Sequence, residues 1–277
     1  MCLRKLLINA LVGTWNLKDR PTMNVIIERI EEALDLQNPC ASPTVTIGSL
    51  QYDIPESFLI PLEEIIKATR DFSPETCIGG GGFGKVYRGQ LSKQWQNRTA
   101  AFKRLDHNGY KGKNEFLTEL KMMSSFNHED IVPLIGYCDQ GNEMIIVSEF
   151  ASNGSLNHHL RNPNNSISLT WAQRMKICMG AAKGLEYLHS GLGENRAVIH
   201  RDMKSSSILL DDNLDAKICN FELSLFVNPN QPQVYEPGAG TQFYIDPIYK
   251  ESGMVNAGSD VYSFGIVMFE MLSGMLA

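Results

Sequence analysis

The sequence contains no apolar run near the ~18 residues that a membrane-spanning helix requires, so it predicts no transmembrane segment. Its 6 cysteines form no Cys-x-x-Cys pair and no metal-ligand spacing, which is typical of reduced thiols in a cytoplasmic protein. Basic residues are in the minority, because 25 Lys and Arg stand against 31 Asp and Glu for a net charge of -6. This balance argues against nucleic acid as a partner.

The chain does contain two regions of different character, within a length of 277 residues that is ample for a buried core. From Thr76 to Leu105, short β-rich runs alternate with glycines, whereas helical periodicity dominates beyond Leu169. The expected helices cover 113–126, 171–190 and 258–272, and further strands cover 132–137 and 144–149. This order predicts an α+β fold with a small β-rich lobe, a larger helical lobe and a cleft between them.

The first part of the chain is expected to be a separate helical segment. Pro21 suits the first turn of a helix that continues to about Leu36 with apolar residues at helical spacing. Prolines and serines then interrupt the periodicity between Gln37 and Ser49, as in a linker. We therefore predict a helical segment at 1–37, a linker and lead-in segment at 38–71, and a domain at 72–277 whose lobes are 72–150 and 151–277.

A glycine-rich turn between the first two predicted strands fits the pattern G-x-G-x-x-G-x-V. The stretch IGGGGFGKVYRG supplies Gly79, Gly81, Gly84 and Val86. Glycines let such a turn lie flat over phosphate groups and present backbone N–H groups without side-chain obstruction. Taken alone, the same cluster also suits a plain flexible turn.

A lysine and a glutamate follow this turn at positions where they could form an ion pair. Lys103 lies on the third predicted strand, in AAFKRL, where its ammonium group could contact phosphates; the alternative is a solvated strand lysine. Glu119 lies in the next predicted helix, in NEFLTELKMM, and is favoured as its partner over Glu115 one turn earlier.

The stretch IHRDMKSSSILL contains the residues with the strongest catalytic signature. Asp202 could orient a substrate hydroxyl group or accept its proton, and Lys204 could neutralise a phosphoryl group during transfer. The neighbouring Arg201 completes the candidate catalytic set. The competing interpretation is that this stretch is only a charged surface turn. The glycine-rich turn and Lys103 earlier in the sequence favour the catalytic interpretation over it.

Taken together, these motifs resemble the cytoplasmic domain of plant receptor-like protein kinases of the Ser/Thr type. The stretches HEDIVPLIGYC, GAAKGLEYLH and SDVYSFGIVMFEMLSG also match that family in register, and the resemblance covers residues 58–272. It implies a two-lobed protein-kinase fold that uses ATP and acts on or binds another protein, such as a second receptor-like kinase. The implied location is the cytoplasm, with the plasma membrane reached through partners.

The same resemblance assigns roles to further residues. Glu149 and Ala151 fall in the hinge that meets adenine, next to a gatekeeper residue at Ser148. Asp260 falls where a helix, helix F of the family, anchors the catalytic loop. Lys204 together with Thr241 marks a Ser/Thr rather than a tyrosine kinase.

The sequence departs from the family where metal ions are held. Ser207 replaces the asparagine that binds a second Mg²⁺, and Asn220 replaces the aspartate of the Asp-Phe-Gly motif. Glu222 replaces the glycine of that motif, whose backbone freedom the family uses. These substitutions put Mg²⁺ binding in doubt and predict impaired phosphoryl transfer.

The segment after this motif and the two ends of the chain also depart from the pattern. No Ser or Thr occurs between Leu225 and Gly240, so Arg201 has no obvious phosphorylated partner there, and Ile248 stands where the family has a glutamate. The helical lobe is expected to be truncated after helix F. In contrast, a stretch near the start of the chain resembles the closing helices of a kinase domain: LKDRPTMNVIIERIEEALDLQ. Within it, Arg20 stands at the position of the arginine that, late in the family's helical lobe, pairs with the glutamate replaced here by Ile248. The alternative is an unrelated helical hairpin.

Three functional hypotheses follow from these features. The first is an ATP-binding pseudokinase that acts as a signalling scaffold or regulator. The second is a weakly active Ser/Thr kinase that relies on Lys103, Asp202 and Lys204. The third is a truncated product without biochemical function.

Overall fold

The computed structural model describes residues 21–34, 55–82, 84–105, 110–161, 169–190, 196–228, 230, 233–274 and 276. The chain divides into two compact units, each described here by itself. The β unit comprises Leu50–Asn127 and Val132–Ser152, and the helical unit comprises Met1–Ser49, His128–Ile131 and Asn153–Ala277. The linker predicted at Gln37–Ser49 and the position of Arg20 lie outside the described residues.

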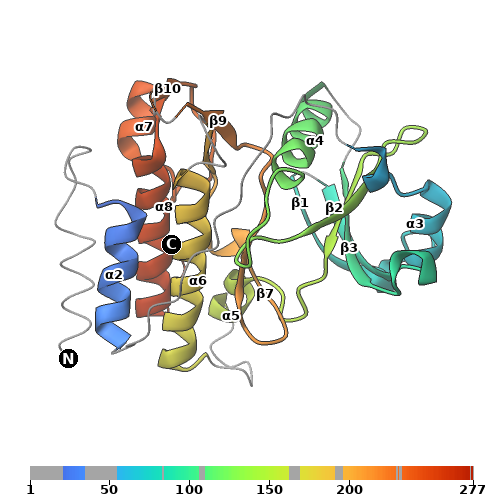
Figure 1. Cartoon of the computed structure of the whole chain (residues 1–277), viewed down its shortest axis with the longest axis horizontal. Helices are drawn as coiled ribbons and strands as arrows, with labels where there is room; N and C mark the ends of the chain where they lie inside the picture. Colours follow the sequence, from blue (N-terminus) through green and yellow to red (C-terminus); the bar gives the residue numbers. More distant parts are fainter. Residues whose placement is uncertain are drawn as a thin grey trace. The chain divides into compact units, whose positions relative to one another are not determined.

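The β unit is built on one antiparallel sheet of five strands in the order β1-β2-β3-β5-β4. Its helices and strands are η2 (Glu56–Phe58), α3 (Leu62–Ala68), η3 (Pro74–Thr76), β1 (Cys77–Gly81), β2 (Gly84–Gln90), η4 (Lys93–Trp95), β3 (Thr99–Leu105), α4 (Tyr110–Met123), β4 (Leu134–Cys138) and β5 (Ile145–Glu149) (Figure 1). The strands and α4 therefore occupy the regions that the sequence predicted for them.

The core of the β unit follows from alternation along the central strands. In β3, Ala100 and Phe102 point to one side of the sheet and have no exposed surface. The residues that alternate with them, Thr99, Ala101 and Lys103, point to the other side and are half-buried. The buried cluster is completed from α3 and the neighbouring strands by Ile60, Ile65, Tyr87, Leu91, Ile135, Cys138, Ile145 and Val147. Edge strand β1 is exposed along its whole length. The sheet thus places β3 at its centre, between β2 and β5, and leaves the glycine-rich strand β1 at its edge.

The helical unit contains five α-helices and several short strand pairs among its described residues. They are α2 (Met23–Leu34), α5 (Leu156–Arg161), α6 (Trp171–Ser190), β6 (Ala197–Ile199), η5 (Ser205–Ser207), β7 (Ile208–Leu210), β8 (Ala216–Ile218), β9 (Leu225–Val227), β10 (Val234–Tyr235), α7 (Pro247–Ser252), β11 (Met254–Val255) and α8 (Ala257–Ser273). The pairs are β6 with β9, β7 with β8, and β10 with β11, all antiparallel. The sequence predicted α2, α6 and α8 but not these strands.

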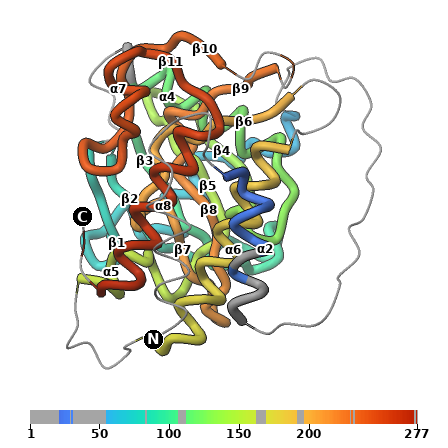
Figure 2. The backbone as a smooth tube through the Cα atoms, turned by 90° about the vertical axis from the view of Figure 1, so that its left-hand side faces the viewer, coloured from blue at the N-terminus to red at the C-terminus, as the bar shows by residue number. Residues whose placement is uncertain are grey.

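Helix α6 is the centre of the helical unit. Its buried residues lie on several faces of the helix, as expected of a helix surrounded by other elements: Met175, Ile177, Cys178, Met179, Ala181, Ala182, Gly184, Leu185 and Leu188. Strands β6 and β8 and helices α2 and α8 all contact it. In Figure 2, α2 runs alongside α6. No helix in the described part of the chain is long and apolar enough to cross a membrane.

Asp130 carries a buried carboxyl group where the His128–Ile131 loop meets α6 and β8. Its Oδ1 atom would lie 2.7 Å from a Cβ placed on Gly180, so a side chain at position 180 would displace this carboxyl group. Its backbone carbonyl accepts the N–H group of Ile218 at 2.8 Å. Burial, reinforced by the charge of Glu129, raises the pKa of Asp130 to about 7.

Removing the charge of Asp130 is therefore expected to stabilise the protein at alkaline pH. Because the folded protein binds this proton more tightly than the unfolded chain, its contribution to stability is complete below the unfolded pKa of about 3.9 and is lost as the pH rises through about 7. Asp130→Asn should raise the melting temperature by several degrees at about pH 8 and by less at about pH 5. The exposed Asp139→Asn serves as the control, and equal shifts at both pH values would contradict this assignment.

Candidate active site

The glycine-rich turn is an exposed hairpin formed by β1 and β2. Gly79 pairs with Val86, and Gly81 pairs with Gly84 across the turn. A Cβ atom on Gly79 or Gly81 would meet nothing within 4 Å, so the backbone there is open to a ligand. Gly84 is different: its φ is 131°, and a Cβ would lie 2.1 Å from the carbonyl oxygen of Arg104. Only glycine fits at that position.

Lys103 and Glu119 form a close ion pair in the β unit. Val86 faces Lys103 across the β2–β3 ladder, which places the lysine next to the glycine-rich hairpin. The Nζ atom of Lys103 lies 2.7 Å from Oε2 of Glu119, and the two side chains are 16% and 3% exposed. This is the pairing that the sequence favoured over Glu115. An ammonium group fixed in this way offers a preorganised charge for phosphates.

The two hinge positions lie at the end of β5. Glu149 is exposed, pairs with Ala100 of β3 and donates its backbone N–H to the carbonyl of Pro133 at 3.1 Å. Ser148 faces Ala101 on the same ladder, and Ala151 follows the strand as a half-buried residue. The hinge backbone therefore extends directly from the ordered centre of the sheet.

Asp260 holds the loop that carries the catalytic candidates of the helical unit. It lies in the first turn of α8 with no exposed surface. Its Oδ2 atom accepts the backbone N–H of His200 at 2.7 Å, and its Oδ1 atom accepts that of Arg201 at 2.8 Å. The Nε2 atom of His189, from α6, lies 2.9 Å from Oδ2. The predicted anchoring role of Asp260 is confirmed.

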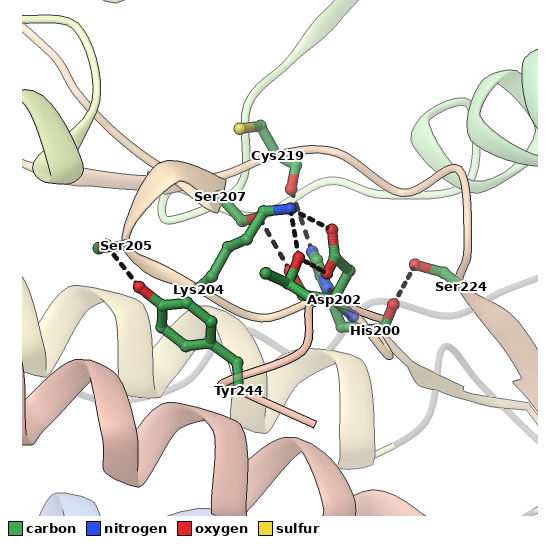
Figure 3. Close-up of polar contacts among 9 residues, drawn as sticks. His200, Asp202, Lys204, Ser205, Ser207, Cys219, Ser224 and Tyr244 are labelled. Atoms are coloured by element: carbon green, nitrogen blue, oxygen red, sulfur yellow. Dashed lines mark hydrogen bonds and ion pairs between the residues drawn. The ribbon is translucent and has the colours of Figure 1, made fainter. Parts of the chain in front are cut away.

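Asp202 lies at the centre of a polar network that Figure 3 shows. Its Oδ2 atom accepts the ammonium group of Lys204 at 2.6 Å, and its Oδ1 atom accepts the hydroxyl of Thr241 at 2.7 Å. Lys204 also donates to that threonine hydroxyl at 2.8 Å. The backbone N–H of Asp202 donates to Nδ1 of His200 at 3.2 Å. The carboxylate is therefore held in place by a donor on each of its oxygens.

The residues at the two metal positions offer poor ligands. Ser207 has no exposed surface, and its hydroxyl donates to the backbone carbonyl of Asp202 at 2.9 Å (Figure 3). Asn220 is half-buried and carries a neutral amide. Hard divalent cations prefer charged oxygen ligands. Both positions therefore carry a neutral side chain.

Glu222 fits the backbone better than the sequence suggested. We expected its side chain to restrict a position that needs the freedom of glycine. However, Glu222 is not among the residues with positive φ, whereas Asn220 two positions earlier has a φ of 69°. Its side chain is 5% exposed. In this conformation, position 222 therefore does not require glycine.

Arg201 is held by a tyrosine, which the sequence analysis missed. The residue is 9% exposed, and its Nε and Nη2 atoms donate to the hydroxyl of Tyr249 at 3.1 and 2.7 Å. Its Nη1 atom donates to the carbonyl of Leu223 at 3.0 Å. The same hydroxyl accepts the backbone N–H of Ala239 at 3.2 Å. Tyr249 of α7 thus connects the loop of Arg201 to the segment that contains Ala239.

Removing this single hydroxyl is expected to destabilise the protein measurably. Tyr249→Phe leaves the buried guanidinium and the Ala239 N–H without their common acceptor, at a cost of about 1–3 kcal/mol in the free energy of unfolding. Tyr235→Phe is the matched control, because Tyr235 is 66% exposed. Urea unfolding measures both variants. If the two variants unfold at the same midpoint, the hydroxyl has no such role.

A half-buried tyrosine, Tyr244, connects the loop that contains Ser205 to Glu270 of α8. The hydroxyl of Tyr244 donates to Oε1 of Glu270 at 2.6 Å and lies 3.2 Å from the hydroxyl of Ser205. Burial and the bond to Glu270 raise the pKa of Tyr244 to about 12, so this phenol stays protonated at all physiological pH values. No sequence pattern predicted this contact, because its partners lie 26 and 39 residues away.

Comparison with known proteins gives a consistent result. The family model described as protein tyrosine and serine/threonine kinase matches residues 72–276. A probable receptor-like protein kinase of Arabidopsis thaliana is 46% identical over 218 residues, which are 78% of this chain and 26% of the relative. The serine/threonine-protein kinase PBS1 of the same plant is 44% identical over 216 residues, which are 77% of this chain and 46% of the relative.

A longer match is found with a probable leucine-rich repeat receptor-like protein kinase of Arabidopsis thaliana. It is 37% identical over 273 residues, which are 97% of this chain and 27% of the relative. The chain therefore spans about a quarter to a half of the length of these curated relatives.

Proposed function

This chain belongs to the protein tyrosine and serine/threonine kinase family, and we propose that it is an ATP-binding member with impaired phosphoryl transfer that acts as a signalling scaffold or regulator. Its resemblance to receptor-like Ser/Thr kinases supports ATP as the nucleotide. In this proposal the open backbone at Gly79 and Gly81 and the ammonium group of Lys103 hold the phosphates. The hinge backbone at Glu149 and Ala151 meets the adenine.

The single observation that carries the impairment is the fully buried hydroxyl of Ser207. Its one proton is donated to the carbonyl of Asp202, and a neutral, fully buried hydroxyl is a poor ligand for Mg²⁺. Asn220 supplies an amide in place of a carboxylate. Losing one preorganised charge-stabilising contact typically costs a factor of ~10²–10³ in rate. With both positions altered, we propose a loss of ~10³ or more, which is ~4 kcal/mol of barrier.

A second candidate function is a slow Ser/Thr kinase. The observation that favours it is the complete network of Asp202, Lys204 and Thr241, in which every polar contact lies between 2.6 and 2.8 Å. Here Asp202 would take the proton of the substrate hydroxyl, and Lys204 would compensate charge on the transferred phosphoryl group.

Radiolabel transfer from ATP to a generic Ser/Thr protein substrate separates these two functions. The proposed impaired member should transfer no more phosphate than the Asp202→Asn variant, which removes the charge that orients the hydroxyl group. Transfer by the natural sequence at more than about tenfold the rate of this variant would favour the slow kinase and overturn the impairment. A melting curve of each protein confirms that equal amounts are folded.

The partner and the location remain part of the same proposal. We place the chain in the cytoplasm, with another receptor-like kinase as the protein that it regulates and through which it reaches the plasma membrane. Affinity purification of the full chain from plant tissue should recover a receptor-like kinase. Failure to recover any receptor-like kinase above the level seen with an unrelated protein would contradict this partner.

A further inference from the structure

We infer that helix α2, which packs on α6, acts as an intramolecular brace for the catalytic loop. Among the residues of α2 whose burial the structure describes, three are buried: Met23, Ile26 and Ile30, with 2%, 5% and 0% of their surface exposed. They recur three and four positions apart, which places them on one face of the helix. On the opposite side, Asn24 and Glu28 are exposed.

The surroundings of α2 explain why this helix forms at all. It has 12 residues, with no acidic residue in its first turn and no basic residue in its last. Isolated helices of this length are marginal in water, so the stability of α2 must come from packing on another element. Helix α6 is that element, as Figure 2 shows. Without α2, part of the apolar surface of α6 would face water.

The same helix α6 is connected to the catalytic loop at two points. Its last turn supplies His189, whose Nε2 atom contacts Asp260, the residue that holds the backbone of His200. It also packs against β6, the strand that leads directly into His200. A change in the packing of α6 is therefore transmitted to the loop through contacts that the structure contains. This connection gives α2 a positioning role beyond its own stability.

The arrangement also favours docking within one molecule. Twenty residues, 35–54, connect α2 to the β unit, and a chain of that length spans up to ~60 Å when extended. Such a tether keeps the helix at an effective concentration of about millimolar near its own α6. A second copy would have to compete with this local concentration. The proposal is therefore contact in cis.

Paired substitutions in α2 test this proposal in the full-length chain. Ile30→Asp places a charge on the buried face, and Asn24→Asp places the same charge on the exposed face. We expect Ile30→Asp to lower the melting temperature by several degrees and to speed hydrogen exchange at the His200 and Arg201 amides by about tenfold or more. Asn24→Asp should change neither quantity. Unchanged melting and exchange in Ile30→Asp would overturn the proposal.

Two further measurements keep the test decisive if Ile30→Asp fails to fold. Ile30→Ala should show the same two effects at smaller amplitude, and it overturns the proposal if loop exchange matches that of the natural sequence.

A protease site introduced between residues 38 and 54 allows the tether to be cut in the folded protein. After cleavage, α2 should remain bound and dissociate on dilution. Light scattering compares the natural chain with Ile30→Asp. If the natural chain is a dimer and the variant is a monomer, α2 binds a second copy, and this overturns docking in cis.

Discussion

The combined substitutions Ser207→Asn, Asn220→Asp and Glu222→Gly are expected to raise phosphoryl transfer by about 10²- to 10³-fold. Asn220→Asp returns a charged metal ligand, and Ser207→Asn returns an amide oxygen at the second position. Glu222→Gly removes a negative charge two residues from Asn220. The three substitutions together should exceed the sum of the single variants, because they act on one site. Radiolabel transfer per folded molecule, with Mg²⁺ present, measures the gain.

Two controls make this result interpretable. Because Ser207 is fully buried, the larger asparagine has to displace its surroundings, so each variant also needs a melting curve. Adding Asp202→Asn to the triple variant should abolish the gain, since the restored site still depends on that carboxylate. If the natural sequence already matches the triple variant, impairment at these positions is wrong.

Removing the carboxylate of Asp260 is expected to cost about 3–5 kcal/mol in the free energy of unfolding. Asp260→Ala leaves the buried N–H groups of His200 and Arg201 without acceptors and takes away the contact of His189. Asp260→Asn retains one oxygen acceptor and should lose less. Urea unfolding with a constant slope measures both.

Glu251→Ala is the matched control for Asp260. Glu251 is an exposed acidic residue of the same unit, and surface substitutions of this kind change stability by less than about 0.5 kcal/mol. A loss for Asp260→Ala that is no larger than this control would show that the loop is held by other contacts.

The sequence predicted the helices and strands that have a strong periodicity. It also predicted contacts between residues that belong to one recognisable motif. The helix at 171–190 agrees with α6 at both ends, because twenty residues of helical pattern leave little ambiguity. The pairing of Lys103 with Glu119 followed from one strand and the next helix. In contrast, strands β6 and β9 have three residues each, which is too short to show a period.

Contacts set by tertiary packing could not be predicted. The hydroxyl of Tyr249 meets Arg201 across 48 positions of sequence, and nothing in the composition of either segment indicates that the guanidinium turns toward a phenol. The backbone conformation of Glu222 depends on the path of its own loop, which the identity of the residue does not reveal. The apolar stripe of α2 predicted a buried face, but only the structure identifies α6 as the surface it contacts.

The most direct test of the central claim is a thermal-shift titration of the full chain with ATP, in Mg²⁺ and in excess chelator. The account predicts that ATP at a hundred times its dissociation constant stabilises the protein by about 2.7 kcal/mol in both conditions, because the glycine-rich hairpin and Lys103 are intact while Ser207 and Asn220 make poor metal ligands. No shift at millimolar ATP, or a shift that requires Mg²⁺, would contradict it.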